Sequence, residues 1–502
     1  MGEDDARAFV REAAADGEKI QKVSTRDRIV EAVLGLDPVF WRDARGEAYA
    51  TLSVDGRRER YRVGSHAFRD LVVLAYGDAN PVAGRGGSRP GAPPSNALTE
   101  ALNALKALAL RGGVREPRPR VWQAGDGSVW LDLGREDWSL AHVTAEGWRL
   151  VASADVPLVR PPGLEPLSVP QCDPEALQKL GRLLNLGHGR DLLLICAWLV
   201  KALHPNGPNP VLALDGEQGS GKTTAAKMLR RLVDPSLADA RAAPASERDL
   251  VIAASNGRLV VLDNVSSLDV KMSDALCRVA TGGGWGERQF FTNGEEHIAQ
   301  VCNPVLLNGI PNLLVRGDLA DRAIAVTLAA IPDEDRRPEH EVWGEFDQAA
   351  PGIVALLLDG LAMALRERSR LHLPRRLRMA DFAEVACAAA PALGATKEEM
   401  LAALEENRAE AVEVVFDADP LAGAIRKFAL ECGSWKGTAT ELLRELGKSV
   451  EHQEGRGQDW PKDATRLSNR LRRAIPVLRR AGVEVEQRRT NTERWIAIRS
   501  IV

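Results

Sequence analysis

A glycine-rich run near the middle of the chain has the residue types that bind the phosphates of a nucleotide. The run 216–223 is Gly-Glu-Gln-Gly-Ser-Gly-Lys-Thr. Its glycines let successive backbone N–H groups turn toward a phosphate, Lys222 neutralises phosphate charge, and the Thr223 hydroxyl is a ligand for Mg²⁺. The residues expected to bind nucleotide are Gly216, Glu217, Gln218, Gly219, Ser220, Gly221, Lys222, Thr223 and Thr224. This pattern predicts a site for ATP and Mg²⁺.

An aspartate that follows a second apolar run could bind the same metal ion. Four apolar residues, 259–262, lead to Asp263. About 40 residues separate Lys222 from Asp263, which is enough for the helix and crossover that connect parallel strands. Taken alone, such a run is usually a buried strand with a capped exit. Behind a complete phosphate loop, we expect Thr223 and Asp263 to form the magnesium site, with Asp263 acting through water.

The residue after Asp263 is an amide, where most ATPases of this type have a second carboxylate. That carboxylate orients the water that attacks the nucleotide. Asn264 can position a water molecule but cannot take its proton. Because phosphoryl transfer has a loose transition state, positioning and electrostatics can suffice. Both ordinary and slow hydrolysis therefore remain open.

Polar residues further along the chain could complete a catalytic site. The apolar run 304–307 ends at Asn308, whose amide could contact the γ-phosphate and hold the attacking water; a plain strand followed by an Asn-Gly turn is the alternative. In ring ATPases, an arginine just before the next strand reaches the nucleotide of a neighbouring subunit. Arg322 is the first candidate for this role and Arg316 the second, with ion pairs to nearby aspartates as the alternative.

Alternating strands and helices would position these residues. The region from Pro210 to about Leu328 has the α/β alternation of a parallel sheet, and 211–214 suits a buried strand. Helical patterns occupy 174–203 and about 332–415, the second with no strand candidate.

The N-terminal part has a mixed α+β pattern. Hairpin signals occur at the Asp55-Gly56 turn and at 125–127, and five prolines in 157–170 suggest a boundary. The expected domains are 1–165, of unassigned role, then 166–330, 331–418 and 419–502.

The C-terminal part is strongly basic. Helical patterns at 421–430, 439–446 and 462–480 are followed by a hairpin pattern, an order typical of a winged helix. From Trp460 to the end there are eleven Lys and Arg but four Asp and Glu, which favours binding to a phosphate backbone. The candidate DNA contacts here are Arg466, Arg470, Arg472, Arg473, Arg488 and Arg489. A solvated helix face or a docking surface for another subunit is the alternative.

The motifs in 170–330 resemble the AAA+ motor of superfamily 3 helicases, in the branch found in phages, poxviruses and integrated mobile elements. More widely, about 45–500 resembles the replication helicases of actinobacterial integrative elements and prophages. The resemblance implies an α/β fold: an AAA+ P-loop ATPase core with a preceding α+β N-terminal region, a helical segment and a C-terminal winged-helix-like domain. It also implies a homo-hexamer, with single-stranded DNA in the ring channel and replication proteins of the element as partners.

The segment 281–291 is similar to the region between the second and third motifs of phage primase-helicases. In that family, a β-hairpin here projects into the ring channel and grips single-stranded DNA. The run 288–302, with an Asn293-Gly294 turn, could form this hairpin, and Arg288 and His297 would be its DNA contacts. Two glutamates at the turn would repel phosphate.

The composition fits a protein with no membrane partner. The 502 residues suffice for about three domains of roughly 150 residues each. A formal net charge of −4 gives no overall attraction for nucleic acid. The start of the chain lacks an apolar signal segment, and the longest apolar run, 192–203, is too short to span a bilayer. The six cysteines lack metal-ligand spacing and are expected to be reduced thiols. We therefore expect a cytoplasmic protein.

Three functions remain open from the sequence. The first is an ATP-dependent ring helicase that translocates on DNA to replicate a mobile element. The second, favoured by Asn264, is a slow-hydrolysing ATP-gated switch for DNA binding or assembly, serving origin binding or defence. The third, a small-molecule kinase, is disfavoured by the arginines after the third strand and by the basic C-terminal part.

Overall fold

The computed structural model describes residues 23–84, 87–288, 296–309, 314, 316–374, 377–450, 460–489 and 494–501, and the chain divides into two compact units after Pro117. The first unit has a four-stranded sheet of order β3-β2-β1-β6 with helices packed against it. Its elements are α2 (Thr25–Leu34), β1 (Val39–Arg42), β2 (Ala48–Val54), β3 (Arg57–Arg62), α3 (His66–Ala79), β4 (Val82–Gly84), β5 (Gly87–Arg89), α4 (Ser95–Arg111) and β6 (Gly113–Val114).

The second unit begins with a small antiparallel sheet of order β10-β9-β8-β7. Its strands are β7 (Val121–Gln123), β8 (Val129–Asp132), β9 (Leu140–Thr144) and β10 (Gly147–Val151). Its inner residues share one hydrophobic core with helices α6 (Gly189–Leu203) and α11 (Glu339–Glu367). A buried ion pair, Arg120 to Asp234 at 3.0 Å, joins it to the same body. The two compact units thus meet after Pro117, and the proline-rich stretch 157–170 lies within the second unit.

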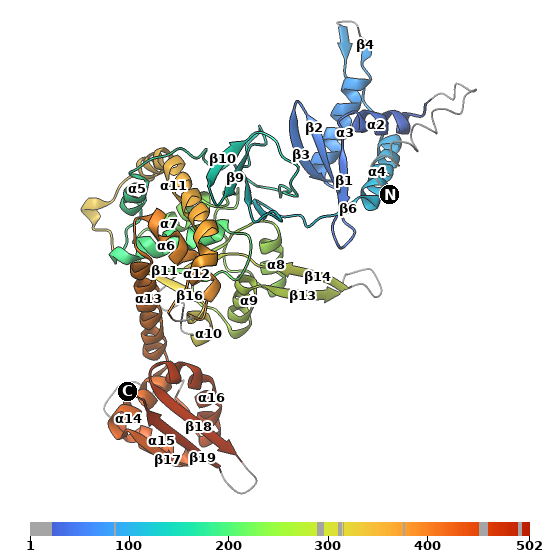
Figure 1. Ribbon diagram of the computed structural model, residues 1–502. Coiled ribbons are helices and arrows are strands. Elements are labelled where there is room, and N and C mark those ends of the chain that lie inside the picture. The colour runs from blue at the N-terminus through green and yellow to red at the C-terminus, as the bar shows by residue number, and fades with distance from the viewer. Residues whose placement is uncertain are drawn as a thin grey trace. The chain divides into compact units, whose positions relative to one another are not determined.

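A four-stranded parallel sheet of order β12-β15-β11-β16 forms the centre of the second unit (Figure 1). Its strands are β11 (Val211–Gly216), β12 (Val260–Val265), β15 (Val305–Gly309) and β16 (Ala323–Leu328). The helices of this region are α5 (Ala176–Leu183), α6 (Gly189–Leu203), α7 (Lys222–Arg231), α8 (Glu247–Ser255), α9 (Val270–Thr281) and α10 (Gly317–Ala320). The expected alternation of strands and helices is present.

The central strands are buried on both faces, which explains their unbroken apolar sequences. In β11, Leu212 and Leu214 belong to the core that includes α6 and α7, while Val211 and Ala213 belong to the core that includes α8 and α9. Side chains of Ser246 and Asp269 accept backbone N–H groups and so cap α8 and α9. Because all four strands are parallel, their carboxyl ends meet at one edge of the sheet.

A two-stranded hairpin lies between α9 and β15. Its strands are β13 (Gly283–Arg288) and β14 (Glu296–Val301), and Figure 1 shows them extending past α8 and α9. The first strand begins five residues before the expected Arg288. Trp285 packs into the core and holds the glycine-rich start of the strand, which has no alternation to reveal it.

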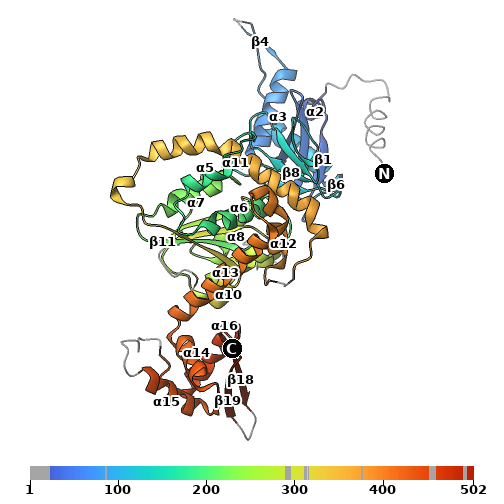
Figure 2. The same cartoon turned by 60° about the vertical axis from the view of Figure 1, so that its left-hand side comes forward.

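Helices follow the sheet, as predicted, and no strand occurs in the described part of 331–418. They are η1 (Asp333–Asp335), α11 (Glu339–Glu367), η2 (Arg368–Arg370), α12 (Ala380–Ala389), η3 (Ala390–Leu393) and α13 (Lys397–Ala418). The stretch Glu339–Arg370 is long and apolar enough to cross a membrane, but 67% of its most apolar window is buried. It packs against α5, α6 and α12, as a core helix does (Figure 2).

The described residues of the C-terminal part form three helices and a three-stranded sheet of order β17-β19-β18. They are α14 (Pro420–Cys432), β17 (Ser434–Gly437), α15 (Ala439–Val450), α16 (Ala464–Arg480), β18 (Val483–Arg489) and β19 (Arg494–Ser500). The predicted helices and hairpin are present. The extra strand β17 has four residues and little hydrophobic pattern, so the sequence did not indicate it.

Candidate nucleotide site

The glycine-rich loop joins β11 to α7 at the carboxyl edge of the sheet. Gly216, Gly219 and Gly221 all have positive φ, at 143°, 84° and 83°. A side-chain carbon on Gly216 would lie 2.6 Å from the Leu328 carbonyl oxygen, so this position requires glycine. No side chain caps the N-terminus of α7. Its first N–H groups are therefore available to an anion.

Lys222 lies over this loop. Its Nζ donates to the carbonyl oxygens of Gly216 and Glu217, both at 2.7 Å. Ser220 is fully buried beneath it, while Glu217 and Gln218 are exposed. The ammonium group and the loop N–H groups thus form a positively charged cradle suited to a polyphosphate.

The two predicted magnesium ligands are in direct contact. The Thr223 hydroxyl donates to Asp263 Oδ1 at 2.8 Å, although about 40 residues separate them in sequence. A hydroxyl and a carboxylate are the hard oxygen ligands that Mg²⁺ prefers, and nucleotide phosphates and water normally supply the others. No cluster of three or more His, Cys, Asp or Glu residues suited to a metal occurs in the part of the chain that is described. The residues present therefore fit a nucleotide-bound Mg²⁺.

Asn264 and Asn308 form a hydrogen-bonded pair between β12 and β15. The Asn264 backbone N–H donates to Asn308 Oδ1 at 2.7 Å. Asn264 has φ of 54°, a left-handed conformation that asparagine tolerates better than most residues, and its side chain is exposed.

This contact fixes which way the Asn308 amide faces. Because a backbone N–H can only donate, Asn308 must present its oxygen to Asn264, and its Nδ2 faces away. That nitrogen is buried and has no hydrogen-bond partner among the described residues. An unpaired buried donor is costly. A phosphate oxygen or a positioned water would satisfy it.

Arg322 lies at the opposite edge of the sheet from the phosphate loop. Val211 pairs with Ala323 at one end of β11 and β16, and Gly216 pairs with Leu328 at the other. These five residue steps span about 16 Å of strand. Among the described residues, Arg322 forms no ion pair; its guanidinium donates to the Asp318 carbonyl oxygen at 2.8 Å. This arginine is therefore distant from the nucleotide site of its own chain.

Arg316 has a different environment. It forms ion pairs with Asp274 at 3.2 Å and with Asp318 at 3.3 Å. The ion-pair alternative thus applies to Arg316. Asp321, the aspartate next to Arg322 in the sequence, pairs with Arg378 at 3.4 Å. Arg322 is the better candidate to reach a neighbouring subunit.

Comparison with known proteins identifies the family. Residues 177–411 match the model of the actinomycete integrative conjugative element replication protein, and residues 421–501 match the model of the AICE RepA C-terminal domain. The two matches lie in order and together cover more than half of the chain. The chain belongs to this family of replication proteins.

The solved structures found to be similar to this replication protein have low sequence identity and low TM-scores. The SCCmec type IV Cch active helicase has 12% identity and a TM-score of 0.46, with 92% of each chain covered. The apo C-terminal region of NrS-1 has 12% identity and a TM-score of 0.41, over 94% of this chain and 98% of that one. Likenesses at this level assign neither a mechanism nor a substrate. A search of curated proteins finds no match.

The candidate DNA contacts of the replication protein lie in two places. In the hairpin β13–β14, Arg288 pairs in register with Glu296, and His297 with Glu287. The side chains of Arg288 and His297 lie outside the described residues, as does the predicted turn at 293–294.

In the C-terminal sheet and helix, the candidate arginines have unequal surroundings. Arg466 and Arg472 are exposed on α16, and Arg466 pairs with nearby Asp463 at 3.5 Å. Arg470 pairs with Asp419, the residue that caps α14, at 3.2 Å, and so connects two helices. The side chains of Arg473 and Arg489 lie outside the described residues.

Two residues of the C-terminal sheet, Lys436 and Trp495, were not singled out in the sequence but lie close to the candidate Arg488. Lys436 on β17 lies 4.4 Å over the ring of Trp495 on β19, and the Arg488 guanidinium lies 5.7 Å from the same ring. Arg488 also pairs with Glu486 at 3.1 Å. Lys436 and Arg488 are far apart in the sequence, and the pairing of β17 and β18 with β19 brings both to one aromatic ring.

The segment that follows β16 contributes two further residues to the nucleotide site. The Ile331 side chain lies 3.5 Å from where a Cβ on Gly221 would be, and Arg336 lies 3.2 Å from the corresponding point on Gly219. No recognisable motif marks either residue, because the segment is short and irregular.

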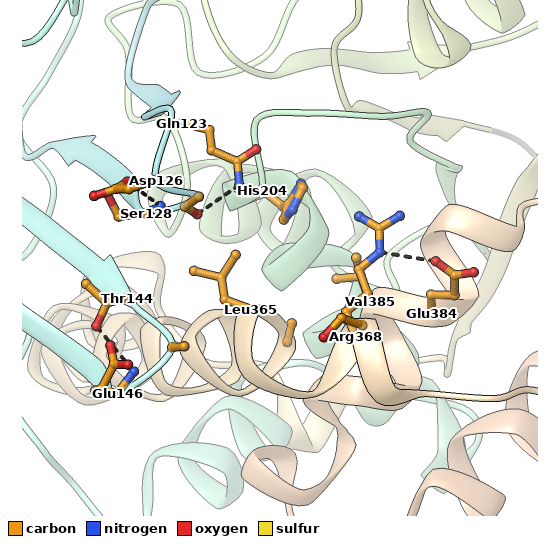
Figure 3. A pocket seen from close by; sticks show the side chains of 14 residues that line it. Gln123, Asp126, Ser128, Thr144, Glu146, His204, Leu365, Arg368, Glu384 and Val385 are labelled. Carbon is orange, nitrogen blue, oxygen red and sulfur yellow. Dashed lines mark hydrogen bonds and ion pairs between the residues drawn. The ribbon is translucent and has the colours of Figure 1, made fainter.

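A cavity of about 590 Å³ lies elsewhere in the second unit (Figure 3). The β7–β8 and β9–β10 turns, the C-terminal ends of α6 and α11, and the middle of α12 line it, and no phosphate-loop residue does. Its Arg368 is paired with Asp381 at 2.9 Å and with Glu384 at 3.1 Å. Burial, with the nearby Lys201 charge, lowers the pKa of His204 to about 3, so this imidazole is neutral. The cavity has no evident part in nucleotide chemistry.

Proposed function

We propose that this replication protein is an AAA+ ATPase that translocates on DNA as a homo-hexameric ring, acting as a cytoplasmic helicase during replication of the integrative element. The observation that supports it best is the Thr223–Asp263 contact beside the phosphate loop. It joins the phosphate-binding and metal-binding halves of an NTPase site. ATP with Mg²⁺ is the proposed substrate.

Asn308 and Arg322 have separate roles in this proposal. The buried Nδ2 of Asn308 would donate to the γ-phosphate or to the attacking water. Arg322, at the far edge of the sheet, would enter the nucleotide site of the next subunit and stabilise charge in the transition state. Each catalytic site would then need two subunits, which favours a closed ring.

DNA would be bound by two surfaces of the ring. The hairpin β13–β14 would contact single-stranded DNA in the channel, through Arg288 and His297. The C-terminal winged-helix-like domain would bind the phosphate backbone through the exposed arginines of α16, and other replication proteins of the element would assemble with the ring.

The test is ATP hydrolysis by the full chain with and without single-stranded DNA, together with native mass measurements with and without ATP. We expect DNA-stimulated turnover and an ATP-dependent hexamer in the parent. Lys222→Ala should lose both, since it removes the charge that lies over the loop. A parent that neither binds ATP nor assembles would refute the proposal.

A second candidate is a slow ATP-gated switch, and Asn264 is the observation that favours it. Installing the missing carboxylate as Asn264→Glu separates the two candidates. If the protein is a motor, we expect Asn264→Glu to raise ATP turnover little, partly because glutamate in this left-handed conformation costs about 1 kcal/mol. If the protein is a switch, we expect negligible ATP turnover by the parent and a clear increase in turnover with Asn264→Glu. Asn264→Gly controls for the backbone, since glycine adopts this conformation freely.

A further inference from the structure

The segment between β16 and α11 lies along the phosphate loop. Its start is fixed because the Ala329 N–H donates to the Asn185 carbonyl oxygen at 2.9 Å. Its end is fixed because Arg337 pairs with Glu345 of α11 at 2.7 Å. Between these points, Arg336 Nη2 lies 3.2 Å from the position that a Cβ on Gly219 would occupy. The Arg336 guanidinium is thus in contact with the tip of the loop.

The electrostatics of this contact are unfavourable without an anion. The loop presents backbone N–H groups, the Lys222 ammonium and the positive end of α7. A guanidinium beside such a surface is repelled by it. The partner of Arg336 is Asp333 at 3.1 Å, and the Asp333 side chain is 89% exposed. An ion pair this exposed to solvent is weak and easily exchanged.

We propose that Arg336 binds the polyphosphate of the nucleotide held by the loop of its own subunit, exchanging Asp333 for phosphate oxygens. The inference rests on the proposed ATP binding and adds a residue to it. The planar donors of arginine suit phosphate, and the side chain is already at the loop. Because the segment continues into α11, binding through Arg336 connects the nucleotide to the helical segment.

Neighbouring residues distinguish this role from a general effect of charge. Arg337 is the adjacent cation but pairs with Glu345, away from the loop. Arg322 is at the opposite edge of the sheet. Arg336 therefore acts within one subunit, and its effect on binding is independent of ring assembly.

The test is equilibrium binding of ATP and ADP, with Mg²⁺ at low salt, to the full chain. Arg336→Ala should weaken binding about tenfold or more, since it removes a charge-assisted contact. Arg336→Lys should recover part of the loss. The matched control, Arg337→Ala, should bind as the parent does. Equal affinities for Arg336→Ala and Arg337→Ala would overturn the proposal.

The Asp333 variant gives a second readout that a merely structural role would not produce. Asp333→Asn frees Arg336 and should tighten ATP binding severalfold, and the gain should vanish in the Asp333→Asn/Arg336→Ala double variant. A loss with Asp333→Asn as large as that with Arg336→Ala would mean that the ion pair only holds the loop, which also overturns the proposal.

Comparing ATP binding by the parent, Lys222→Ala and Arg336→Ala shows whether the role of Arg336 or the proposed function fails. If the parent binds ATP and Lys222→Ala does not, the nucleotide site stands, and a parent-like Arg336→Ala refutes only the role of Arg336. If the parent and Lys222→Ala both fail to bind ATP, the proposed function itself fails.

Discussion

The most informative single residue of the site is Asn308, because its two amide atoms have different surroundings. Its Oδ1 accepts the Asn264 backbone N–H, whereas its Nδ2 is buried without a partner among the described residues. The first contact supports the local fold of β12 and β15. The second atom is the one available for chemistry.

Asn308→Asp separates these two roles. Aspartate keeps an oxygen for the Asn264 N–H but loses the free donor. We expect ATP turnover to fall about 10²-fold, the usual cost of one lost transition-state donor, in steady-state assays at saturating ATP. Asn308→Ala removes both atoms and should also lower the melting temperature of the apo protein further than Asn308→Asp does. Parent-like turnover of Asn308→Asp would exclude Asn308 from the reaction.

At the scale of elements, α16 presents arginines in two different surroundings. Arg466 and Arg472 are exposed, whereas Arg470 reaches the capping residue of α14. The strongly basic composition of the C-terminal part does not distinguish them. Their surroundings in the folded domain do.

Paired variants of α16 test this distinction. Arg466→Ala/Arg472→Ala should weaken DNA binding and reduce the salt slope of log affinity by up to about 2, since each phosphate contact contributes close to one. Arg470→Ala should mainly lower thermal stability. DNA binding titrated over a salt series, with a melting curve for each variant, measures both effects. If Arg470→Ala loses the salt dependence and the double variant keeps it, the assignment is reversed.

Much of the nucleotide site could be predicted from sequence because its chemistry is local. A strand, eight loop residues and a helix together form the phosphate cradle, and the acidic strand end is a short pattern as well. Contacts between distant segments could not be predicted. The Arg120–Asp234 ion pair joins residues 114 positions apart, both in the unit that begins at Arg118. Arg336 reaches Gly219 from a segment with no pattern, and β17 is recognisable only beside β19.

At the scale of the whole molecule, the proposed ring divides each catalytic site between two subunits. The phosphate loop, Asp263 and Asn308 lie at the carboxyl edge of the sheet, and Arg322 lies at the amino edge. One chain therefore cannot bring its own Arg322 to its own nucleotide. In the proposed ring, a neighbouring subunit would supply it.

Mixing two inactive variants tests this claim most directly. Lys222→Ala has a defective loop but an intact Arg322; it forms no ring of its own, but that arginine can enter the ATP-bound loop of an Arg322→Ala subunit. Arg322→Ala has the reverse pattern, an intact loop without the arginine. Alone, each should hydrolyse ATP at least about a thousandfold more slowly than the parent, given the usual effect of an arginine supplied in trans. Mixed at equal concentration with ATP and single-stranded DNA, they should regain a substantial fraction of parental turnover, because some interfaces then combine an intact loop with an intact arginine. A mixture that stays as inactive as its components, while both variants still assemble with the parent, would contradict the shared site.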